Sequence, residues 1–128
     1  MEPTATTMEP ITTTKVVHIS LTTMEVTPDL VVLNQVTGDT AQWHCDDGDA
    51  TVKFKAPKGS PFKKGDPFVV HKGHPEGSGG LKAENDLNIC KKCSPVHYEK
   101  GHAEHYKYEI WRDKVMVIDP EIIIVKSA

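Results

Sequence analysis

The chain has 128 residues and a mass of 14.2 kDa, with 38% hydrophobic and 26% charged residues, proportions that suit one compact domain. Its net charge is -3 and Arg112 is the one arginine among 15 basic residues, so the bidentate donor used for phosphates and base edges is nearly absent and nucleic-acid binding is not expected. Apolar runs reach only four residues, as in Ile122 to Val125, far short of the roughly 20 that cross a bilayer, so no membrane span is expected.

Residues 1–14 contain two copies of a similar seven-residue stretch, which begin at Met1 and Met8 and continue with Glu-Pro and several threonines. Prolines without apolar periodicity are typical of a flexible tail, so the folded domain is predicted to span 15–128. The tail lacks the basic start and the apolar stretch of a secretion signal. A cytoplasmic location is therefore the default prediction, and a periplasmic or secreted location follows if a signal was removed.

From Lys15 onward, apolar and polar residues mostly alternate, which is the period-two pattern of half-buried strands. Predicted strands follow in chain order at 16–21, 31–33, 40–44, 50–54, 67–70, 106–111, 115–118 and 121–125. Trp43 is expected to anchor the core. The stretch 56–80 is rich in proline and glycine and is predicted to be mostly loop, and 81–104 is polar without a clear helical stripe. This pattern predicts an all-β, antiparallel sandwich.

Several of these segments, taken together, resemble a cupredoxin-like domain. The similarity covers about residues 15–126 and rests on Val16 to Leu21, Gly38 to Trp43, Val52 to Phe54, Ser60 to Phe62, Ser78-Gly79, Tyr106 to Tyr108 and Asp119 to Val125. The resemblance implies a Greek-key β-sandwich. The polar stretch before the last strands would then be a long Cys/His-containing loop on that sandwich.

The blue-copper members of that family hold their metal with one histidine after the tryptophan-containing strand. A cysteine, a second histidine and usually a methionine follow the Tyr-x-Tyr strand. Here the first turn carries Asp46, Asp47 and Asp49 before Ala50, and the strand that begins at Tyr106 continues without Cys or His. The recognisable type-1 copper ligands are therefore missing from the expected positions.

The segment from Cys93 to His97 offers an alternative alignment, because Cys-Ser-Pro-Val-His is similar to a copper-ligand loop. In the family, only the final strand follows that loop. Here two predicted strand regions follow it, so copper is ranked behind zinc as a cofactor.

The strongest chemical signal is a Cys/His cluster between residues 90 and 105. Cys90 and Cys93 stand three positions apart, and His97 and His102 follow closely. A C-x2-C turn places two thiolates on one side of a tight loop, and two imidazoles complete the tetrahedral set that zinc prefers. The sequence therefore predicts that these four residues bind zinc. His105 is ranked behind His102, because it begins a strand whose pleat fixes its direction.

The same residues leave two other interpretations open. Cys90 and Cys93 are also spaced as a local disulfide or a redox pair, although no βαβ pattern surrounds them as in thioredoxin-like enzymes. Alternatively, the segment carries no chemistry and presents a recognition surface, as loops on rigid sandwiches commonly do. The third cysteine, Cys45, leaves an odd number, so a complete disulfide framework is excluded.

The turn after the tryptophan-containing strand forms a second cluster. Asp46, Asp47 and Asp49 predict an exposed acidic turn, since no bidentate Glu completes a calcium loop. His44 and Cys45 stand next to this turn. These two residues would add ligands to the Cys/His loop if the fold brought both loops to the same end of the sandwich.

Two further groups lie in the middle of the chain. His71 and His74 are a weaker candidate for a transition-metal pair in a loop. A basic group without arginine or interleaved aromatics is interpreted as a solvated surface, and it comprises Lys53, Lys55, Lys58, Lys63 and Lys64. No phosphate cradle, nucleophilic triad or carboxylate pair supports an enzymatic activity.

These observations together predict a small cupredoxin-like binding module whose Cys/His loop holds zinc. The alternatives are a metal-free protein-interaction domain, a thiol redox protein, and a copper-binding electron-transfer protein. A protein partner belongs to the second of these, and the sequence does not specify which one.

Overall fold

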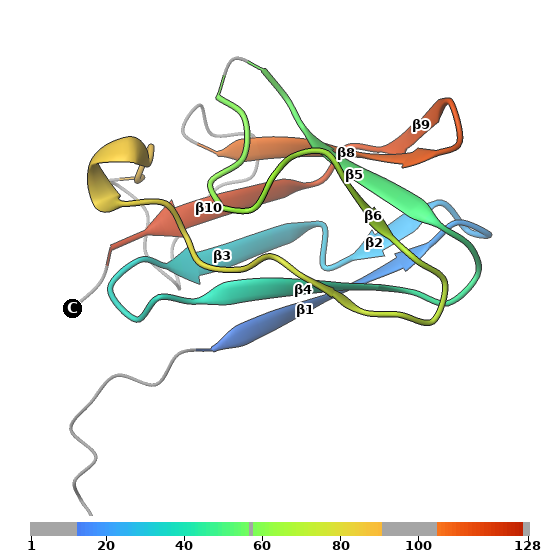
Figure 1. The fold of residues 1–128 in the computed structure, drawn as a ribbon, viewed down its shortest axis with the longest axis horizontal. Helices are drawn as coiled ribbons and strands as arrows, with labels where there is room; N and C mark the ends of the chain where they lie inside the picture. The colour runs from blue at the N-terminus through green and yellow to red at the C-terminus, as the bar shows by residue number, and fades with distance from the viewer. Residues whose placement is uncertain (1–12, 57, 91–104, 127–128) are drawn as a thin grey trace, which may run out of the picture.

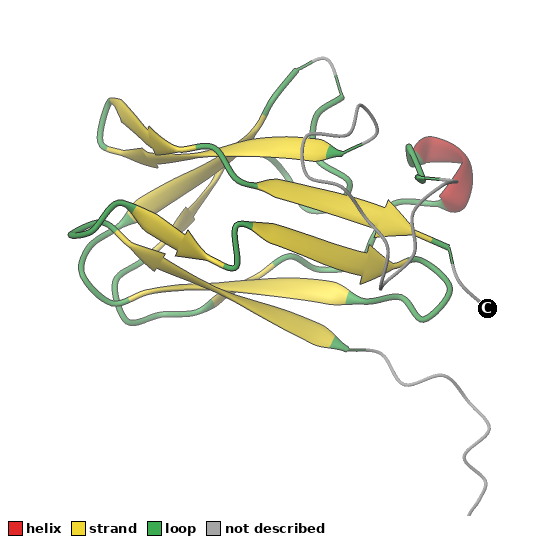
Figure 2. Ribbon diagram, turned by 180° about the vertical axis from the view of Figure 1, so that it is seen from behind, coloured by secondary structure: helices red, strands yellow, loops and turns green. Residues whose placement is uncertain are grey.

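The computed structural model describes residues 13–56, 58–90 and 105–126, which form two β-sheets and one 3-10 turn (Figures 1 and 2). The elements in chain order are β1 (Thr14–Ser20), β2 (Glu25–Thr27), β3 (Leu30–Asn34), β4 (Thr40–Cys45), β5 (Ala50–Phe54), β6 (Phe68–Val70), β7 (Glu76–Gly77), η1 (Glu84–Asp86), β8 (Tyr106–Arg112), β9 (Val115–Ile118) and β10 (Glu121–Val125). The all-β prediction is confirmed. Within the described ranges, no helix has the length and apolar character needed to cross a membrane.

The strands form a four-stranded sheet with the order β2-β1-β4-β7 and a six-stranded sheet with the order β3-β10-β8-β5-β6, in which β9 pairs with β8. β1 runs parallel to β4, and β10 runs parallel to β3. The other pairings between described strands are antiparallel. The prediction of an antiparallel sandwich is therefore wrong for these two pairs. Hydrophobic alternation sets which face of a strand is buried and carries no information about the direction of its neighbour.

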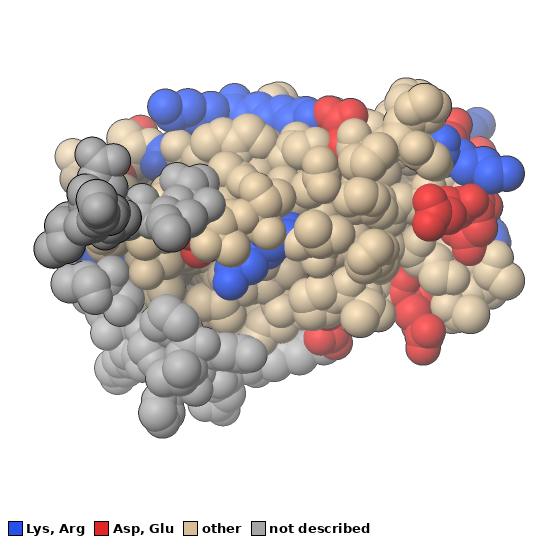
Figure 3. Space-filling model, turned by 90° about the horizontal axis from the view of Figure 1, so that it is seen from below, with Lys and Arg blue, Asp and Glu red and all other residues tan. Residues whose placement is uncertain are grey.

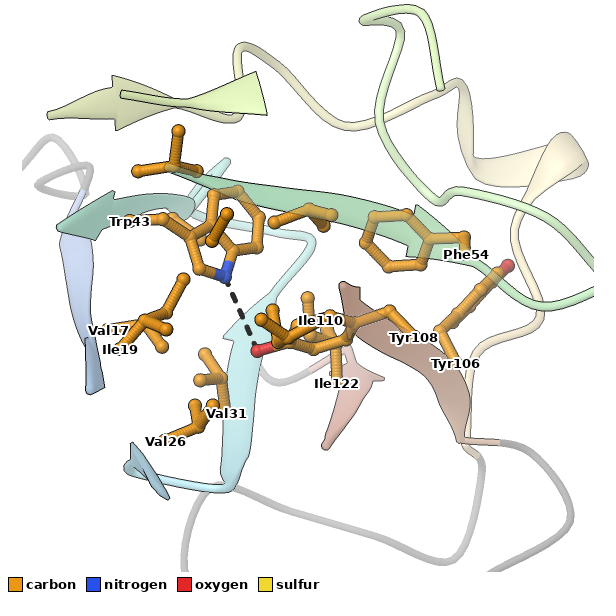
Figure 4. Packing of buried hydrophobic residues seen from close by; sticks show 14 of the residues in the cluster. Val17, Ile19, Val26, Val31, Trp43, Phe54, Tyr106, Tyr108, Ile110 and Ile122 are labelled. Atoms are coloured by element: carbon orange, nitrogen blue, oxygen red, sulfur yellow. Dashed lines mark hydrogen bonds between the residues drawn. The ribbon is translucent and has the colours of Figure 1, made fainter. Parts of the chain in front are cut away.

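The inward faces of both sheets build one core, as the alternation predicts. It takes Val17 and Trp43 from the four-stranded sheet and Val52 and Tyr108 from the six-stranded sheet. Trp43 is fully buried, its ring packs edge-on against Tyr108 with centroids 5.9 Å apart, and its Nε1 donates a hydrogen bond to Tyr108 Oη at 3.3 Å (Figure 4). Each such buried aromatic side chain contributes about 1.5–3 kcal/mol.

β10 differs from the other strands because both of its faces are buried. Ile122 and Ile124 point into the main core, whereas Ile123 and Val125 belong to a second cluster with Cys90 on the outer side. The segment that ends at Cys90 therefore covers the outer face of β10, and the run of apolar residues reflects this double burial.

The remaining differences from the sequence prediction concern short elements. β2 and β7 have three and two residues, too few to show an alternating pattern. β1 already begins at Thr14, which pairs with Thr40, one residue before the predicted start of the domain. The predicted tail otherwise lies in residues 1–12, outside the described residues.

Candidate functional site

The predicted zinc ligands are described only in part. Cys90 lies on the outer side of β10 and is 1% exposed. Cys93, His97 and His102 lie outside the described residues. The structure does describe how the chain approaches and leaves this segment, at Cys90 and at His105.

Both ends of the Cys/His segment are attached to the six-stranded sheet. Cys90 N donates to Ile124 O at 2.9 Å, which adds the segment to the edge of β10 beyond the start of β8. Two residues earlier, Asn88 N donates to Tyr106 Oη at 2.6 Å. His105 immediately precedes Tyr106, which pairs with Ile122 of β10. Cys90 and His105 are therefore held beside neighbouring positions of one buried strand.

His105 forms a buried pair with Glu121. Its Nδ1 lies 3.0 Å from Glu121 Oε1, and the two side chains are only 0% and 4% exposed. Lys58 Nζ donates to His105 O at 2.7 Å and lies over the ring of Tyr106. This environment fixes both the backbone and the ring of His105. A signal for the pair was present in the sequence, since Glu121 opens an otherwise apolar strand and a buried carboxylate requires a partner.

The three cysteines differ in state. Cys90 is disulfide-bonded, whereas Cys45 is a free, buried thiol in the main core. Burial is the main reason that the pKa of Cys45 is raised, and this keeps the thiol protonated and unreactive. A sulfur in a disulfide cannot act as a thiolate ligand at the same time, so zinc at Cys90 requires prior reduction.

His44 and Cys45 lie on a different sheet from Cys90, the described start of the Cys/His segment. Cys45 points into the core between the sheets, and His44 points outward from the four-stranded sheet. Cys90 packs on the outer face of the opposite sheet. Cys93, His97 and His102 lie outside the described residues, so the expectation that His44 and Cys45 add ligands to the Cys/His loop stays a prediction.

The acidic turn between β4 and β5 has a structural role. Asp47 accepts hydrogen bonds from Leu21 N at 3.0 Å and Thr22 N at 2.9 Å, and these bonds hold its pKa well below its usual value. Asp49 accepts a bond from Lys72 N at 2.9 Å, which is the main cause of its lowered pKa. The turn thereby ties the end of β1 and the loop after β6 to one end of the sandwich.

The second predicted histidine pair lies beside this turn. His71 Nδ1 is 3.6 Å from Asp49 Oδ2, and both His71 and His74 are exposed. Across 13–56, 58–90 and 105–126, no three or more His, Cys, Asp and Glu side chains are arranged to hold a metal ion. The loop therefore remains a two-histidine candidate.

The basic group is more strongly engaged than predicted. Lys53 and Lys63 are exposed, but Lys55 pairs with Asp119 at 3.4 Å, Lys58 binds the His105 carbonyl, and Lys64 pairs with Glu76. Figure 3 shows Lys and Arg side chains along one margin of the molecule. These contacts join loops to strands and leave no continuous anion-binding surface in the group.

The positions expected for copper ligands are occupied by other side chains. Ala50 begins β5 and is fully buried, and β8 runs from Tyr106 through to Arg112 with neither Cys nor His. Comparison with known proteins finds no family model, no curated protein and no solved structure that matches this chain.

Proposed function

We propose that this protein is a cupredoxin-like binding module with Greek-key connections, and that its Cys/His segment holds Zn²⁺ when Cys90 and Cys93 are reduced. The order of the strands in the two sheets supports the proposal of a sandwich with Greek-key connections. The chain crosses from one sheet to the other between β2 and β3, between β3 and β4, and between β4 and β5, and Greek-key sandwiches also contain connections that cross between their two sheets.

The observation that carries the zinc proposal is the buried His105–Glu121 pair beside Cys90. A histidine that ligates a metal almost always gives its other ring N–H to a carboxylate or carbonyl, which sets the tautomer and the ring orientation. With Nδ1 paired with Glu121, a metal bound by His105 would be ligated through Nε2. The proposed ligand set is therefore Cys90, Cys93 and His105, with one further histidine from the same segment.

Reduction is part of the proposal because Cys90 is disulfide-bonded. We assign Cys93 as its partner, since Cys45 is free and these are the three cysteines of the chain. A thiol reductant supplies two electrons and two protons to open the bond and is itself oxidised to a disulfide. The two thiols then lose their protons as Zn²⁺ binds.

The test is zinc stoichiometry and affinity, measured by competition with a chromogenic chelator on fully reduced and on oxidised protein. We expect reduction of the wild type to add one tightly held equivalent of zinc, and this equivalent to be missing in the oxidised protein and in Cys93→Ser. Glu121→Gln keeps the shape of the pair and should weaken binding by about tenfold to hundredfold. His74→Ala is the control, since it removes an exposed imidazole from another loop.

A thiol redox or structural disulfide is the second candidate, and the bonded state of Cys90 favours it. If the reduced protein takes up no zinc and the disulfide re-forms on removal of the reductant, the zinc proposal is wrong. Low exposure of Cys90 favours a structural staple over a catalytic disulfide, because catalytic cysteines are accessible.

A further inference from the structure

A second set of metal-binding side chains lies on the outer face of the four-stranded sheet, opposite the sheet that carries the Cys/His segment. His18 of β1 and His44 of β4 are direct partners in the parallel register, and both point away from the core. Their ring centroids are 5.4 Å apart. β1 and β4 lie lowest in Figure 1, so Figure 3 looks onto this side of the molecule, where acidic side chains gather at the right-hand end.

The two rings line an open cavity of about 310 Å³ together with carboxylates. Glu25 lies on the outward face of β2 beside Ser20, and Asp46 follows His44 by two residues. Asp47 also lines the cavity, but its oxygens accept bonds from the amides of the β1–β2 turn. Glu25 and Asp46 therefore contribute negative charge to the lining of the cavity beside the two rings.

Gln42 positions one of the rings. Its Oε1 lies 2.9 Å from His44 Nε2, and since an amide oxygen only accepts hydrogen bonds, Nε2 carries the proton. The lone pair of neutral His44 is then on Nδ1, which is the nitrogen available to a metal. A carbonyl-type partner on the other ring nitrogen is the usual support of a ligating histidine.

We propose that His18 and His44 bind a divalent transition-metal ion of the Ni²⁺, Cu²⁺ and Zn²⁺ group through their two imidazoles, with water completing the coordination. Imidazole suits these ions, and the acidic neighbours favour a cation over an anion. The exposed His18 ring turns toward His44 as the ion binds. The ion occupies the sheet surface without displacing any core side chain.

The test is a titration of the full-length, oxidised protein with Ni²⁺ alone, followed by NMR with residue-specific amide and imidazole signals. Ni²⁺ is paramagnetic and does not oxidise thiols, so the location of line broadening reports the site. We expect the signals of His18, His44 and Ser20 to broaden at the lowest Ni²⁺ concentrations. Broadening that begins at His71 and His74, or equally at all histidines, would overturn the proposal.

Variants test whether the two rings act together. Removal of a supporting partner already costs about tenfold to hundredfold in metal affinity, so His18→Ala and His44→Ala should each cost at least about tenfold. His74→Ala removes an exposed loop imidazole and should leave the affinity unchanged. An unchanged affinity in either His18→Ala or His44→Ala refutes a two-imidazole site. Thermal unfolding of each variant shows that its fold is kept.

Discussion

At the scale of single residues, Asp47 shows how one exposed carboxylate can organise a turn. Its two oxygens accept bonds from Leu21 N and Thr22 N, and Ser20 Oγ donates to it at 3.2 Å. The bonds from Leu21 N and Thr22 N favour its ionised form and are the main reason that its pKa is lowered. The charge of Asp47 thus fixes the path of the chain between β1 and β2.

We expect Asp47→Asn to reduce stability near neutral pH by about 1 kcal/mol, because the amide group turns a donor toward backbone donors at an exposed position. A folded pKa below the usual 3.8 means that this contribution is full above that value and is lost as the pH falls through the folded pKa. Urea unfolding between about pH 7 and pH 2 should therefore show the two proteins converging in acid. Asp46→Asn, in the same turn, should show no such convergence. A constant difference at all pH values contradicts this account.

Tyr108 accepts a hydrogen bond from the indole of the core tryptophan, Trp43. We expect Tyr108→Phe to lower the free energy of unfolding by about 1–3 kcal/mol, because Trp43 Nε1 is then buried without an acceptor. The control is Tyr106→Phe, which also removes a tyrosine hydroxyl. That hydroxyl accepts a hydrogen bond from Asn88 N, and this bond is less buried than the Trp43–Tyr108 bond. Chemical denaturation should give the larger loss for Tyr108→Phe, and equal losses would argue against the importance of the Trp43 contact.

At the scale of elements, the turn between β4 and β5 packs against the end of β1. A Cβ at Gly48 would stand 2.9 Å from Leu21 Cδ1, whose side chain is nearly buried. Gly48→Ala should therefore cost about 1–3 kcal/mol through overpacking, to which the positive φ of 157° at Gly48 adds backbone strain. Gly65→Ala is the matched control, because a Cβ there meets nothing within 4 Å. A thermal-unfolding midpoint that is equally unaffected in both variants would show that Leu21 moves aside without cost.

The same scale separates what the sequence could predict from what it could not. Val17 and Ile19, like Ala41 and Trp43, are buried on one side of their strands, as the period of two predicted. The alternating pattern did not reveal the direction of the strands or the presence of the short strands β2 and β7. The burial of the outer face of β10 could not be predicted either, because the segment that contains Cys90 and packs on this face is not a strand. Burial follows local pattern, whereas pairing depends on contacts between distant parts of the chain.

The candidate site shows a similar division. The spacing of Cys90 and Cys93 identified a segment with its own chemistry, and Cys90 is indeed covalently engaged. The position of His105 opposite a carboxylate depends on the register of β8 and β10, where Lys107 pairs with Glu121. That register is a tertiary property, so a ranking of ligands by spacing alone could not include Glu121.

At the scale of the whole molecule, the absence of copper ligands at the expected positions leads to a spectroscopic prediction. Reduced protein mixed with Cu²⁺ should not develop an intense blue thiolate-to-copper band, because Ala50 and the residues after Tyr108 supply no Cys or His. Copper bound by imidazoles alone gives only weak visible absorption. An intense band that disappears in Cys93→Ser would instead support the alignment of Cys93 and His97 as a copper-ligand loop.

The parallel pairing of β3 with β10 has a consequence for folding during synthesis of the chain. The ribosome makes β3 well before β10, so one edge of β3 has no strand partner while residues 35–120 are being made. β1 and β4 can pair much sooner, which lets the four-stranded sheet assemble first. Pairing between such distant segments is slow because a long loop must close, and the waiting strand edges are prone to aggregation. The interval in which only the four-stranded sheet exists is therefore the stage of synthesis at which the new chain exposes the most unpaired strand edge.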